Sequence, residues 1–528
     1  MDKIKYIFLL LSLSILYIAG IQAQTISIHH PHLKFLFEDS LLLRPDYHSA
    51  LQPVQTHCRA SLGHASLAKE RSLSLPKGSA SSTSNATNIP GCSTRYSVLG
   101  TRYSFLSPVL NASFSYNQNT GTFSYKFAQG AYIASNLGKR AGFELSAILY
   151  EQKFPGQSYS IDSLELVPRH NRYLSGKGEQ AVYGAIRGNI WWKANKWLTL
   201  TAGNDKHFIG DGQRSLLLSE NAAAYPFFQT RLNIWKINYQ HQVMFMRDLV
   251  EGAGSKRFQK YTSQHTLSYN HKNRFNFYIF EAVIWRKQDS ARHRGFDLSY
   301  LNPFLFYRPV EYNQGSPDNV LMGIGGKWRI YGKNYLYGQF ILDEFNFKYV
   351  TKNNGWWASK YGFQAGFKTY GLWKNKKSLL LLEYNHMRPF TYAHTYSLQN
   401  YGYLQQPLAH PLGSSFRELT GVLSVAFSPQ WMLHASGLIQ RYGTDPDTLN
   451  YGSDIYKRQW TFSKFYGNYI GQGILNTVVE GSAEISRILV PHWRWVAFAD
   501  LRLRIHKTGA DQRVIPFLSL GVKTLLYE

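Results

Sequence analysis

The chain has 528 residues, a formal net charge of +26 and a slightly negative mean hydropathy of −0.31. Beyond the N-terminus it contains no run of about 18 apolar residues, which excludes a helical membrane protein. Aromatic residues make up 16% of the chain, an enrichment typical of strands that cross two membrane interfaces.

The N-terminus has the pattern of a secretory signal over residues 1–23. Lys3 and Lys5 precede an apolar run from Tyr6 to Ile18, and small residues after that run offer cleavage points. We therefore predict a mature chain that begins at Gln24 and is exported to the periplasm of a Gram-negative cell. For an exported chain we expect no nucleic-acid partner.

Residues 24–95 do not alternate in polarity, and the stretch Ser72–Gly91 is rich in serine. We predict a small periplasmic or plug-like segment here. Cys58 and Cys92 are the only cysteines, and in an oxidising compartment they either form one disulfide or remain two free thiols.

From Tyr96 onward, short runs alternate between apolar and polar residues and are separated by turn signals, for example at Asn117–Gly121. Further strands are expected around Leu232–Met246, Arg274–Trp285, Tyr335–Phe345, Ser378–His386, Gly421–Phe427, Met432–Arg441 and Gly473–Ile488, with a closing strand at Phe517–Tyr527. At roughly 24 residues per strand and connection, residues 96–528 predict an all-β transmembrane antiparallel barrel of about 16 to 18 strands.

The stretch His492–His506 shows this pattern most clearly. One face carries Trp493, Leu501 and Leu503, whereas the other carries Arg494, Asp500, Arg502 and Arg504, with Val496 and Phe498 as apolar exceptions. Only a strand separates alternate residues in this way. An oily face and a charged face on one strand predict lipid outside and a wet lumen inside, which requires a closed barrel in the outer membrane.

Three segments interrupt the strands. The segment Gly203–Phe228 contains a turn at Gly210, Asp211 and Gly212, but it lacks the spacing of a phosphate-binding loop, so we interpret it as structural. The segment Tyr300–Gly326 carries a strong turn signal at Gly315, Pro317, Asp318 and Asn319. The segment Tyr384–Glu418 mixes aromatic rings with histidines, arginines and amides, a composition that suits either sugar binding or an interfacial girdle.

Ser414, Ser415, His410 and Glu418 are residue types found in hydrolases, but no GxSxG nucleophile motif stands among them. We predict that the protein is not an enzyme. The histidines have no paired ligand spacing, so we also predict no metal site and no cofactor.

The interrupting segments resemble the Wzi family of capsule-assembly outer-membrane barrels, in particular a Bacteroidota branch that includes RemB-type gliding motility proteins. The matching strings are KHFIGDGQRSLLLSENAAAYPF (Lys206–Phe227), NQGSPDNVLMGIGGKW (Asn313–Trp328), YGQFILDEF (Tyr337–Phe345), RPFTYAH (Arg388–His394) and QPLAHPLGSSFRE (Gln406–Glu418). The resemblance implies a barrel of about eighteen strands that acts as a surface lectin and tethers exported polysaccharide. The gliding branch implies adhesion or movement, and capsule-export or gliding machinery as partners.

The charge of +26 implies an anionic partner, for which outer-membrane lipid with lipopolysaccharide phosphates and acidic surface polysaccharide are the candidates. Our leading hypothesis is a barrel that binds or anchors polysaccharide. The expected ligand contacts are Arg214, Arg388, Tyr392, His410, Arg417, Arg494, Arg502 and Arg504. The alternatives are a gliding or adhesion component and an anion-selective diffusion channel.

Overall fold

The computed structural model describes residues 25–28, 51–52, 54–57, 104–154, 166–171, 174–249, 256–272, 274–288, 295–302, 318–343, 354–373, 376–490 and 493–525. Several predictions fall outside these residues, namely the signal over residues 1–23, the pair Cys58 and Cys92, and the turn residues Gly315 and Pro317.

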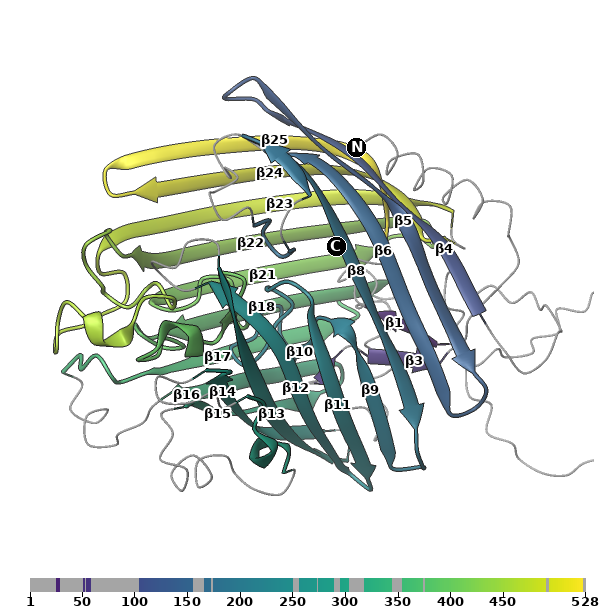
Figure 1. The fold of residues 1–528 in the computed structure, drawn as a ribbon. Helices are drawn as coiled ribbons and strands as arrows, with labels where there is room; N and C mark the ends of the chain where they lie inside the picture. Colours follow the sequence, from purple (N-terminus) through teal and green to yellow (C-terminus); the bar gives the residue numbers. More distant parts are fainter. Residues whose placement is uncertain are drawn as a thin grey trace, which may run out of the picture.

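Eighteen antiparallel strands close into a barrel (Figure 1), which confirms the predicted fold class. The strands are β4 (Ser104–Asn117), β5 (Thr122–Leu137), β6 (Ala141–Lys153), β8 (Gln180–Lys193), β9 (Leu198–Asp205), β11 (Tyr225–Ile234), β12 (Ile237–Leu249), β13 (Arg257–His271), β14 (Phe275–Arg286), β15 (Asn319–Tyr331), β16 (Asn334–Asp343), β17 (Tyr361–Tyr370), β18 (Lys377–Met387), β21 (Phe416–Ala426), β22 (Trp431–Thr444), β23 (Ile474–Val490), β24 (Trp495–Thr508) and β25 (Asp511–Thr524).

Short elements complete the described structure. They are β1 (Thr25–Ile28), β2 (Leu51–Gln52), β3 (Val54–His57), β7 (Ser175–Lys177), β10 (Phe208–Ile209), β19 (Gly402–Tyr403), β20 (Gln406–Pro407), and the 3-10 turns η1 (Leu298–Leu301), η2 (Ser397–Gln399) and η3 (Gln459–Thr461). None of the described helices is long and apolar enough to cross a membrane.

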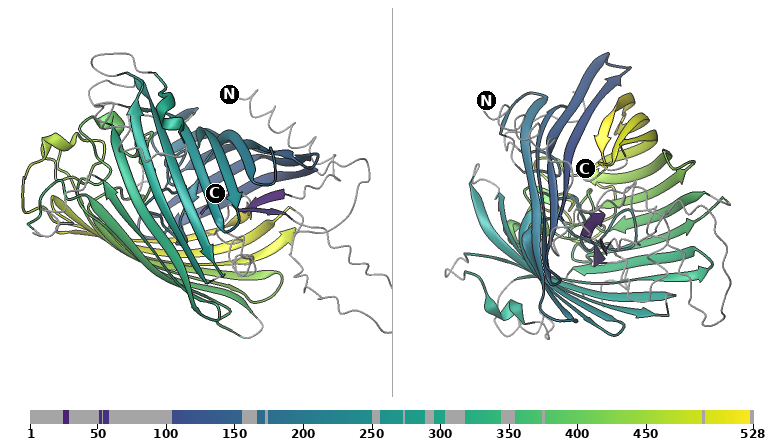
Figure 2. Two further views of the ribbon diagram at one scale, coloured as in Figure 1. Left: turned by 90° about the horizontal axis from the view of Figure 1, so that it is seen from below. Right: turned by 90° about the vertical axis from the view of Figure 1, so that its right-hand side faces the viewer.

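The first and last barrel strands close the ring. Strand β25 pairs with β4 in a register that places Leu518 opposite Tyr116, and the end-on view shows the continuous wall (Figure 2, right). Because every barrel strand has two neighbours, the barrel exposes no open sheet edge, as a structure in hydrocarbon requires.

Strand β24 separates its side chains as predicted. Leu501 and Leu503 are 61% and 47% exposed on the outer wall, whereas Arg502 and Arg504 point to the inner wall, where both lie within 4.0 Å of the Glu480 carboxylate. The apolar exception Val496 is fully buried with Met432 and Leu525 in a small cluster. Phe498, the other exception, lies under the ammonium of Lys523 at 4.6 Å.

The barrel has two different ends. At the turn end, connections are short and both termini of the barrel emerge; these connections are residues 138–140, 194–197, 235–236, 272–274, 332–333, 371–376, 427–430 and 491–494. The loop end carries the long connections, residues 154–179, 206–224, 250–256, 287–318, 344–360, 388–415 and 445–473. A functional site is therefore expected at the loop end, where the connections are long enough to form one.

One expected strand is wrong. The stretch Leu232–Met246 is not a single strand but a hairpin, since β11 ends at Ile234 and β12 begins at Ile237. Trp235 makes the turn with a φ of 54°. An aromatic residue is unusual in this left-handed conformation, and no glycine or asparagine stands at the two turn positions to signal the reversal.

The N-terminal pieces that the structure describes lie inside the ring of strands (Figure 2, right, purple). Strand β1 pairs with β3, and β2 pairs with β10 of the 206–224 connection through Gln52 opposite Phe208. The domain boundary at residues 95 and 96 stays a prediction.

Candidate functional site: folded-in loops and an aromatic surface

The 206–224 connection folds into the barrel instead of extending away from it. Leu216, Leu217 and Leu218 have no exposed surface and belong to the largest apolar cluster. Their backbone is held by the barrel wall, because the Oε1 of Gln339 accepts the N–H of Leu216 at 2.8 Å. An apolar stretch in the lumen needs such partners, since a buried peptide group without a hydrogen bond is costly.

Glu383 of β18 anchors the turn of this segment. Its carboxylate accepts the backbone N–H groups of Gln213 at 2.8 Å and Arg214 at 3.1 Å, and the hydroxyl of Tyr337 at 2.8 Å. Gly212 is needed beside it, because a Cβ there would lie 1.9 Å from a carboxylate oxygen. The predicted structural turn is thus docked on the wall through its backbone.

Asp211 of the same turn lies between two lysines of the inner wall. Its Oδ1 is 3.3 Å from Lys327 Nζ and 3.9 Å from Lys368 Nζ, and Lys368 also donates to the Asp211 carbonyl at 3.0 Å. All three side chains are nearly or fully buried. The carboxylate therefore compensates two buried cations and fixes the segment across the lumen.

The 388–415 connection packs over the first segment and brings His410 to Glu418. The Nε2 of His410 lies 2.9 Å from Glu418 Oε1, and its Nδ1 accepts the N–H of Leu412 at 3.2 Å. These partners define a neutral ring that donates to the carboxylate. Burial lowers the pKa of His410 below its usual value, against the opposing effect of Glu418.

Glu418 also receives Arg214 from the first segment, with 3.3 Å between Arg214 Nε and Oε1, and Gln440 of β22 at 2.6 Å. One buried carboxylate thus connects two connections and the wall. The hydroxyl of Ser414 donates to the carbonyls of Gly452 and Ser453 at 2.6 and 3.1 Å, so it is engaged with backbone and not with the His410 ring.

Tyr392 has no exposed surface. Its backbone N–H donates to Asp343 at 2.6 Å and its hydroxyl donates to the carbonyl of Leu216. Burial raises the pKa of its hydroxyl well above the ordinary value. The residue joins the two folded-in connections to β16.

Arg388 holds two outer loops together. Its guanidinium donates to the carbonyls of Ser359 at 3.3 Å, Asn468 at 3.2 Å and Trp356 at 3.4 Å. Burial lowers the pKa of this side chain. A planar group with five donors suits three carbonyls, two of them from the 344–360 connection and one from the 445–473 connection.

Above Arg388, aromatic rings of residues 356–357 and 460–466 form one contiguous surface, which we call the aromatic surface. Trp357 is buried and stacks on Phe462 at a ring distance of 4.8 Å, and it supports Trp460 at 5.2 Å. Outward from these rings lie Phe465 and Tyr466, 5.2 Å apart. Trp460, Phe465 and Tyr466 are 59%, 51% and 49% exposed.

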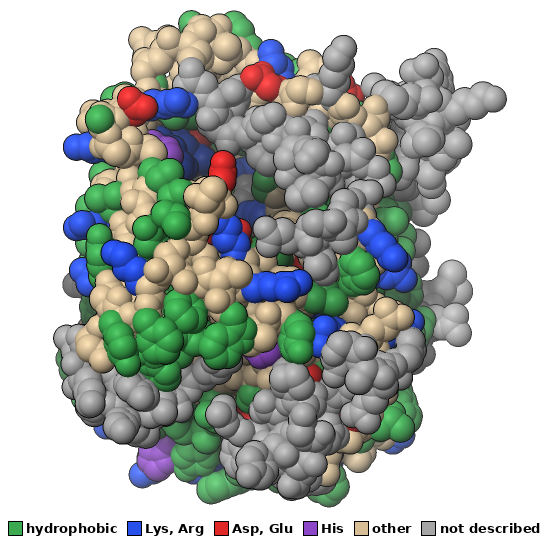
Figure 3. Space-filling view, turned by 60° about the vertical axis from the view of Figure 1, so that its left-hand side comes forward, with side chains coloured by type: hydrophobic (Ala, Val, Ile, Leu, Met, Phe, Trp, Pro, Cys, Tyr) green, Lys and Arg blue, Asp and Glu red, His purple; other side chains and the backbone are tan. Residues whose placement is uncertain are grey.

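The aromatic surface belongs to connections of the loop end, and the longer of them projects beyond the strand ends at the left of Figure 1. Figure 3 brings this end forward and shows hydrophobic side chains together with both acidic and basic groups. Arg458 and Lys464 are exposed on the same connection as Trp460 and Phe465. In such an arrangement the aromatic rings can stack on the face of a sugar, and the neighbouring cations can pair with carboxylates that the sugar carries.

The sequence did not point to these loops. The rings become one surface only when residues 356–357 and 460–466 meet, and a contact between separate loops leaves no period in the sequence. The adjacent pair Trp356 and Trp357, followed by four aromatic residues within seven positions from Trp460, was the only available signal.

The structure places the predicted contact residues at several sites. Arg214 and His410 meet at Glu418, and Arg388 lies under the aromatic surface. Arg417 is exposed on the outer wall, opposite Arg441 in the β21–β22 register. Arg494 lies at the turn end, and Arg502 and Arg504 line the inner wall. As ligand contacts, all eight residues stay predictions.

Asp318 and Asn319 of the second predicted turn are buried at the start of β15. Asp318 accepts the hydroxyl of Tyr300 at 2.7 Å and the amide of Gln399 at 3.0 Å, while Asn319 donates to the Gln399 carbonyl at 2.9 Å. Among the residues that the structure describes, no group of three or more His, Cys, Asp or Glu side chains could hold a metal ion.

Comparison with known proteins finds no protein-family model and no curated protein sequence that matches the chain. Among solved structures, it is similar to Wzi of Escherichia coli, described as an outer-membrane protein involved in group 1 capsule assembly and a carbohydrate-binding β-barrel. The two share 13% identity and a TM-score of 0.49, over 80% of this chain and 85% of Wzi.

Two other similar structures are OccAB2 of Acinetobacter baumannii, with 10% identity and a TM-score of 0.41 over 80% of this chain and 97% of that one, and OprD of Pseudomonas aeruginosa, with 10% identity and a TM-score of 0.40 over 80% and 94%. At identities and scores of this size, no neighbour specifies a ligand for this chain.

Proposed function

We propose that this protein spans the outer membrane and binds surface polysaccharide through the aromatic surface at its loop end. In outer-membrane barrels the short turns face the periplasm and the long loops face the exterior. This orientation puts Trp460, Phe465 and Tyr466 outside the cell. The observation that supports the proposal is their exposure on a surface built from two loops and held by Arg388.

Contiguous exposed aromatic rings mark a surface that binds a ligand or a partner. Sugar rings present flat C–H faces that pack on aromatic side chains, and three exposed rings in sequence suit successive units of a polymer. Arg458 and Lys464 beside them favour a polysaccharide that carries carboxylates or other anionic groups. We assign the protein a binding role and no catalytic step.

The proposal is tested by measuring binding of the detergent-purified protein to polysaccharide extracted from the surface of its own host cell. The double variant Trp460→Ala/Tyr466→Ala should lose roughly tenfold or more in affinity, since exposed aromatic anchors dominate such interfaces. The matched control is Trp197→Ala/Tyr331→Ala, which removes two exposed rings at the turn end. If the wild-type protein does not bind, or if both double variants lose affinity equally, the proposal fails.

The anion-channel alternative fares less well against the charges of the lumen. Buried cations of the inner wall lie beside carboxylates, as in Arg187–Asp205 at 2.6 Å, Lys260–Asp248 at 3.0 Å and Lys523–Glu484 at 2.7 Å. A cation whose charge is balanced by a neighbouring carboxylate attracts a passing anion only weakly. Bilayer recordings that show steady, strongly anion-selective conductance would favour the channel instead.

Membership of the Wzi family and a role in gliding stay predictions from the sequence resemblance. A deletion strain scored for both retained surface polysaccharide and spreading separates the two roles. Loss of retained polysaccharide with normal spreading supports the binding role proposed here, and the reverse result supports gliding.

A further inference from the structure

The basic charge of the chain gathers at the turn end. We define the turn-end rim as residues 138–140, 193–197, 235–236, 271–275, 328–334, 371–377, 427–431 and 487–495. The sequence of this rim contains no Asp or Glu. It contains thirteen described cations, which are Lys139, Arg140, Lys193, Lys196, Lys236, Lys272, Arg274, Arg329, Lys333, Lys376, Lys377, Arg487 and Arg494.

The rest of the barrel differs from this rim. Inner-wall cations lie beside carboxylates, as described above, and the 445–473 connection of the loop end carries Asp445, Asp447 and Asp454 as well as its basic residues. The rim is therefore a band in which the sequence places basic side chains and no acidic ones. A protein keeps such a band where it faces a surface of fixed negative charge.

Aromatic rings accompany the rim cations from turn to turn. The ammonium of Lys196 lies 4.6 Å from the Trp197 ring, and that of Lys236 lies 4.6 Å from the Trp235 ring. Further along, Arg487 lies 5.6 Å from Trp431. Tryptophan prefers the level of lipid headgroups, so these pairs place the cations at the same level as the phosphates.

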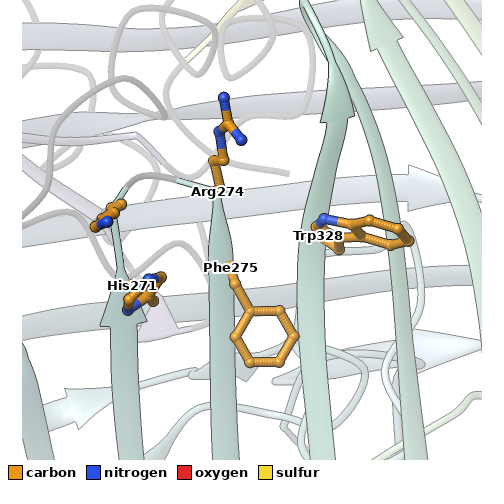
Figure 4. A pocket seen from close by; sticks show the side chains of 5 residues that line it. His271, Arg274, Phe275 and Trp328 are labelled. Carbon is orange, nitrogen blue, oxygen red and sulfur yellow. The ribbon is translucent and has the colours of Figure 1, made fainter.

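One place on the rim forms an open pocket on the outer wall (Figure 4). It has a volume of about 860 Å³ and is lined by His271, Lys272, Arg274, Phe275 and Trp328. The basic residues belong to the β13–β14 turn, and Phe275 and Trp328 face each other in the register of β14 and β15. Toward the middle of the barrel the outer wall continues with exposed Ile279 and Ile324.

From this arrangement we propose that the pocket binds the phosphate headgroup of an anionic phospholipid in the periplasmic leaflet of the membrane. Lys272 and Arg274 pair with the headgroup charge, while Phe275, Trp328 and the apolar wall above them receive the acyl chains. The rest of the rim selects anionic lipid along the same leaflet. This proposal concerns the opposite end of the barrel from the polysaccharide surface and does not depend on it.

The lipid of the outer leaflet does not explain the basic residues of the rim. Lipopolysaccharide lies at the exterior, where the long loops are, whereas the rim lies at the end that carries the termini and short turns. A lipid phosphate and a free phosphate would both pair with Lys272 and Arg274. The apolar half of the pocket, Phe275 and Trp328, favours the lipid, because only a lipid has acyl chains to place there.

The test is native mass spectrometry of the full-length protein in a nonionic detergent, titrated with dilauroyl phosphatidylglycerol, with dilauroyl phosphatidylcholine of the same chain length, or with inorganic phosphate. Phosphatidylglycerol should be retained at roughly tenfold lower concentration than phosphatidylcholine. The double variant Lys272→Glu/Arg274→Glu should weaken phosphatidylglycerol binding by more than about tenfold, because each basic residue near a lipid surface contributes about fivefold.

The control is Arg441→Glu/Lys507→Glu, which reverses two exposed charges at the loop end and should change binding less than about twofold. Migration of unheated samples on a denaturing gel confirms that each variant is folded. Equal retention of the two lipids overturns the proposal, as does an equal loss in both double variants. Displacement of phosphatidylglycerol by inorganic phosphate at the same concentration overturns the assignment to lipid.

Discussion

The Nε2 of His410 lies 2.9 Å from the Oε1 of Glu418, and neither side chain has exposed surface. The two residues stand at the end of a folded-in connection and on the inner wall of β21. Arg214, from another connection, reaches the same oxygen at 3.3 Å. The Glu418 carboxylate therefore holds parts of two folded-in connections to the barrel wall.

Replacing this carboxylate should loosen the folded-in connections. Glu418→Gln keeps the shape but puts an amide donor among the donors of His410, Arg214 and Gln440, so we expect a loss of about 3 kcal/mol in the free energy of unfolding. Thermal denaturation in detergent measures the change. Glu480→Gln is the control, because its partners Arg502 and Arg504 are 47% and 38% exposed and such solvated pairs contribute about 1 kcal/mol or less.

Much of the barrel was predictable because its two surroundings impose a period of two on each strand. Leu501 and Leu503 face outward and Arg502 and Arg504 face inward, as alternation alone indicates. The strand count followed from chain length. The hairpin at Trp235 was missed because neither of its two turn residues, Trp235 and Lys236, is a type that favours a reversal of the chain. The backbone pairing of β11 with β12 stabilises the reversal instead.

The site was less predictable, because burial depends on which connections turn inward. The composition of Tyr384–Glu418 suited either sugar binding or an interfacial girdle, and in the structure Tyr392 and His410 have no exposed surface. Composition reports the polarity of a loop and not its direction. The net charge implied an anionic partner but not where on the barrel that partner binds, and the clearest excess of basic residues lies on the turn-end rim.

The pH dependence of stability should reveal His207, which is buried beside Gln242. The amide of Gln242 lies 2.9 Å from His207 Nδ1, and burial lowers the pKa of His207 to about 4. Between pH 6.5 and about 4, the unfolded chain binds a proton at this residue and the folded chain does not. Stability is therefore fully present above pH 6.5 and falls as the pH falls, by about 3 kcal/mol from this residue.

The measurement is the unfolding midpoint of wild type and His207→Gln across this pH range. The variant should show a shallower fall in stability than the wild type. A wild-type slope that persists in His207→Gln would contradict the assignment.

Gly212 should tolerate no side chain. A Cβ at this position meets Glu383 Oε2 at 1.9 Å and the Tyr337 ring at 2.9 Å, so Gly212→Ala must displace the carboxylate that holds the turn. We expect a loss of roughly 1 to 3 kcal/mol in the free energy of unfolding. In Gly481→Ala the new Cβ meets nothing within 4 Å, and its stability should match or slightly exceed that of the wild type.

Arg388 should act by positioning the aromatic surface. Arg388→Met removes the three donors that join Ser359, Trp356 and Asn468, so the loops that carry Trp357 and Trp460 should separate more often. Trypsin should then cut faster after Lys457, Arg458 or Lys464, and polysaccharide affinity should fall by roughly tenfold. The thermal unfolding of the barrel should change little, because Arg388 lies outside its strands.

Arg388→Lys retains the charge but not the fork of donors, and it should restore only part of the binding. Full binding by Arg388→Met with unchanged cleavage would show that the surface holds its shape without this residue.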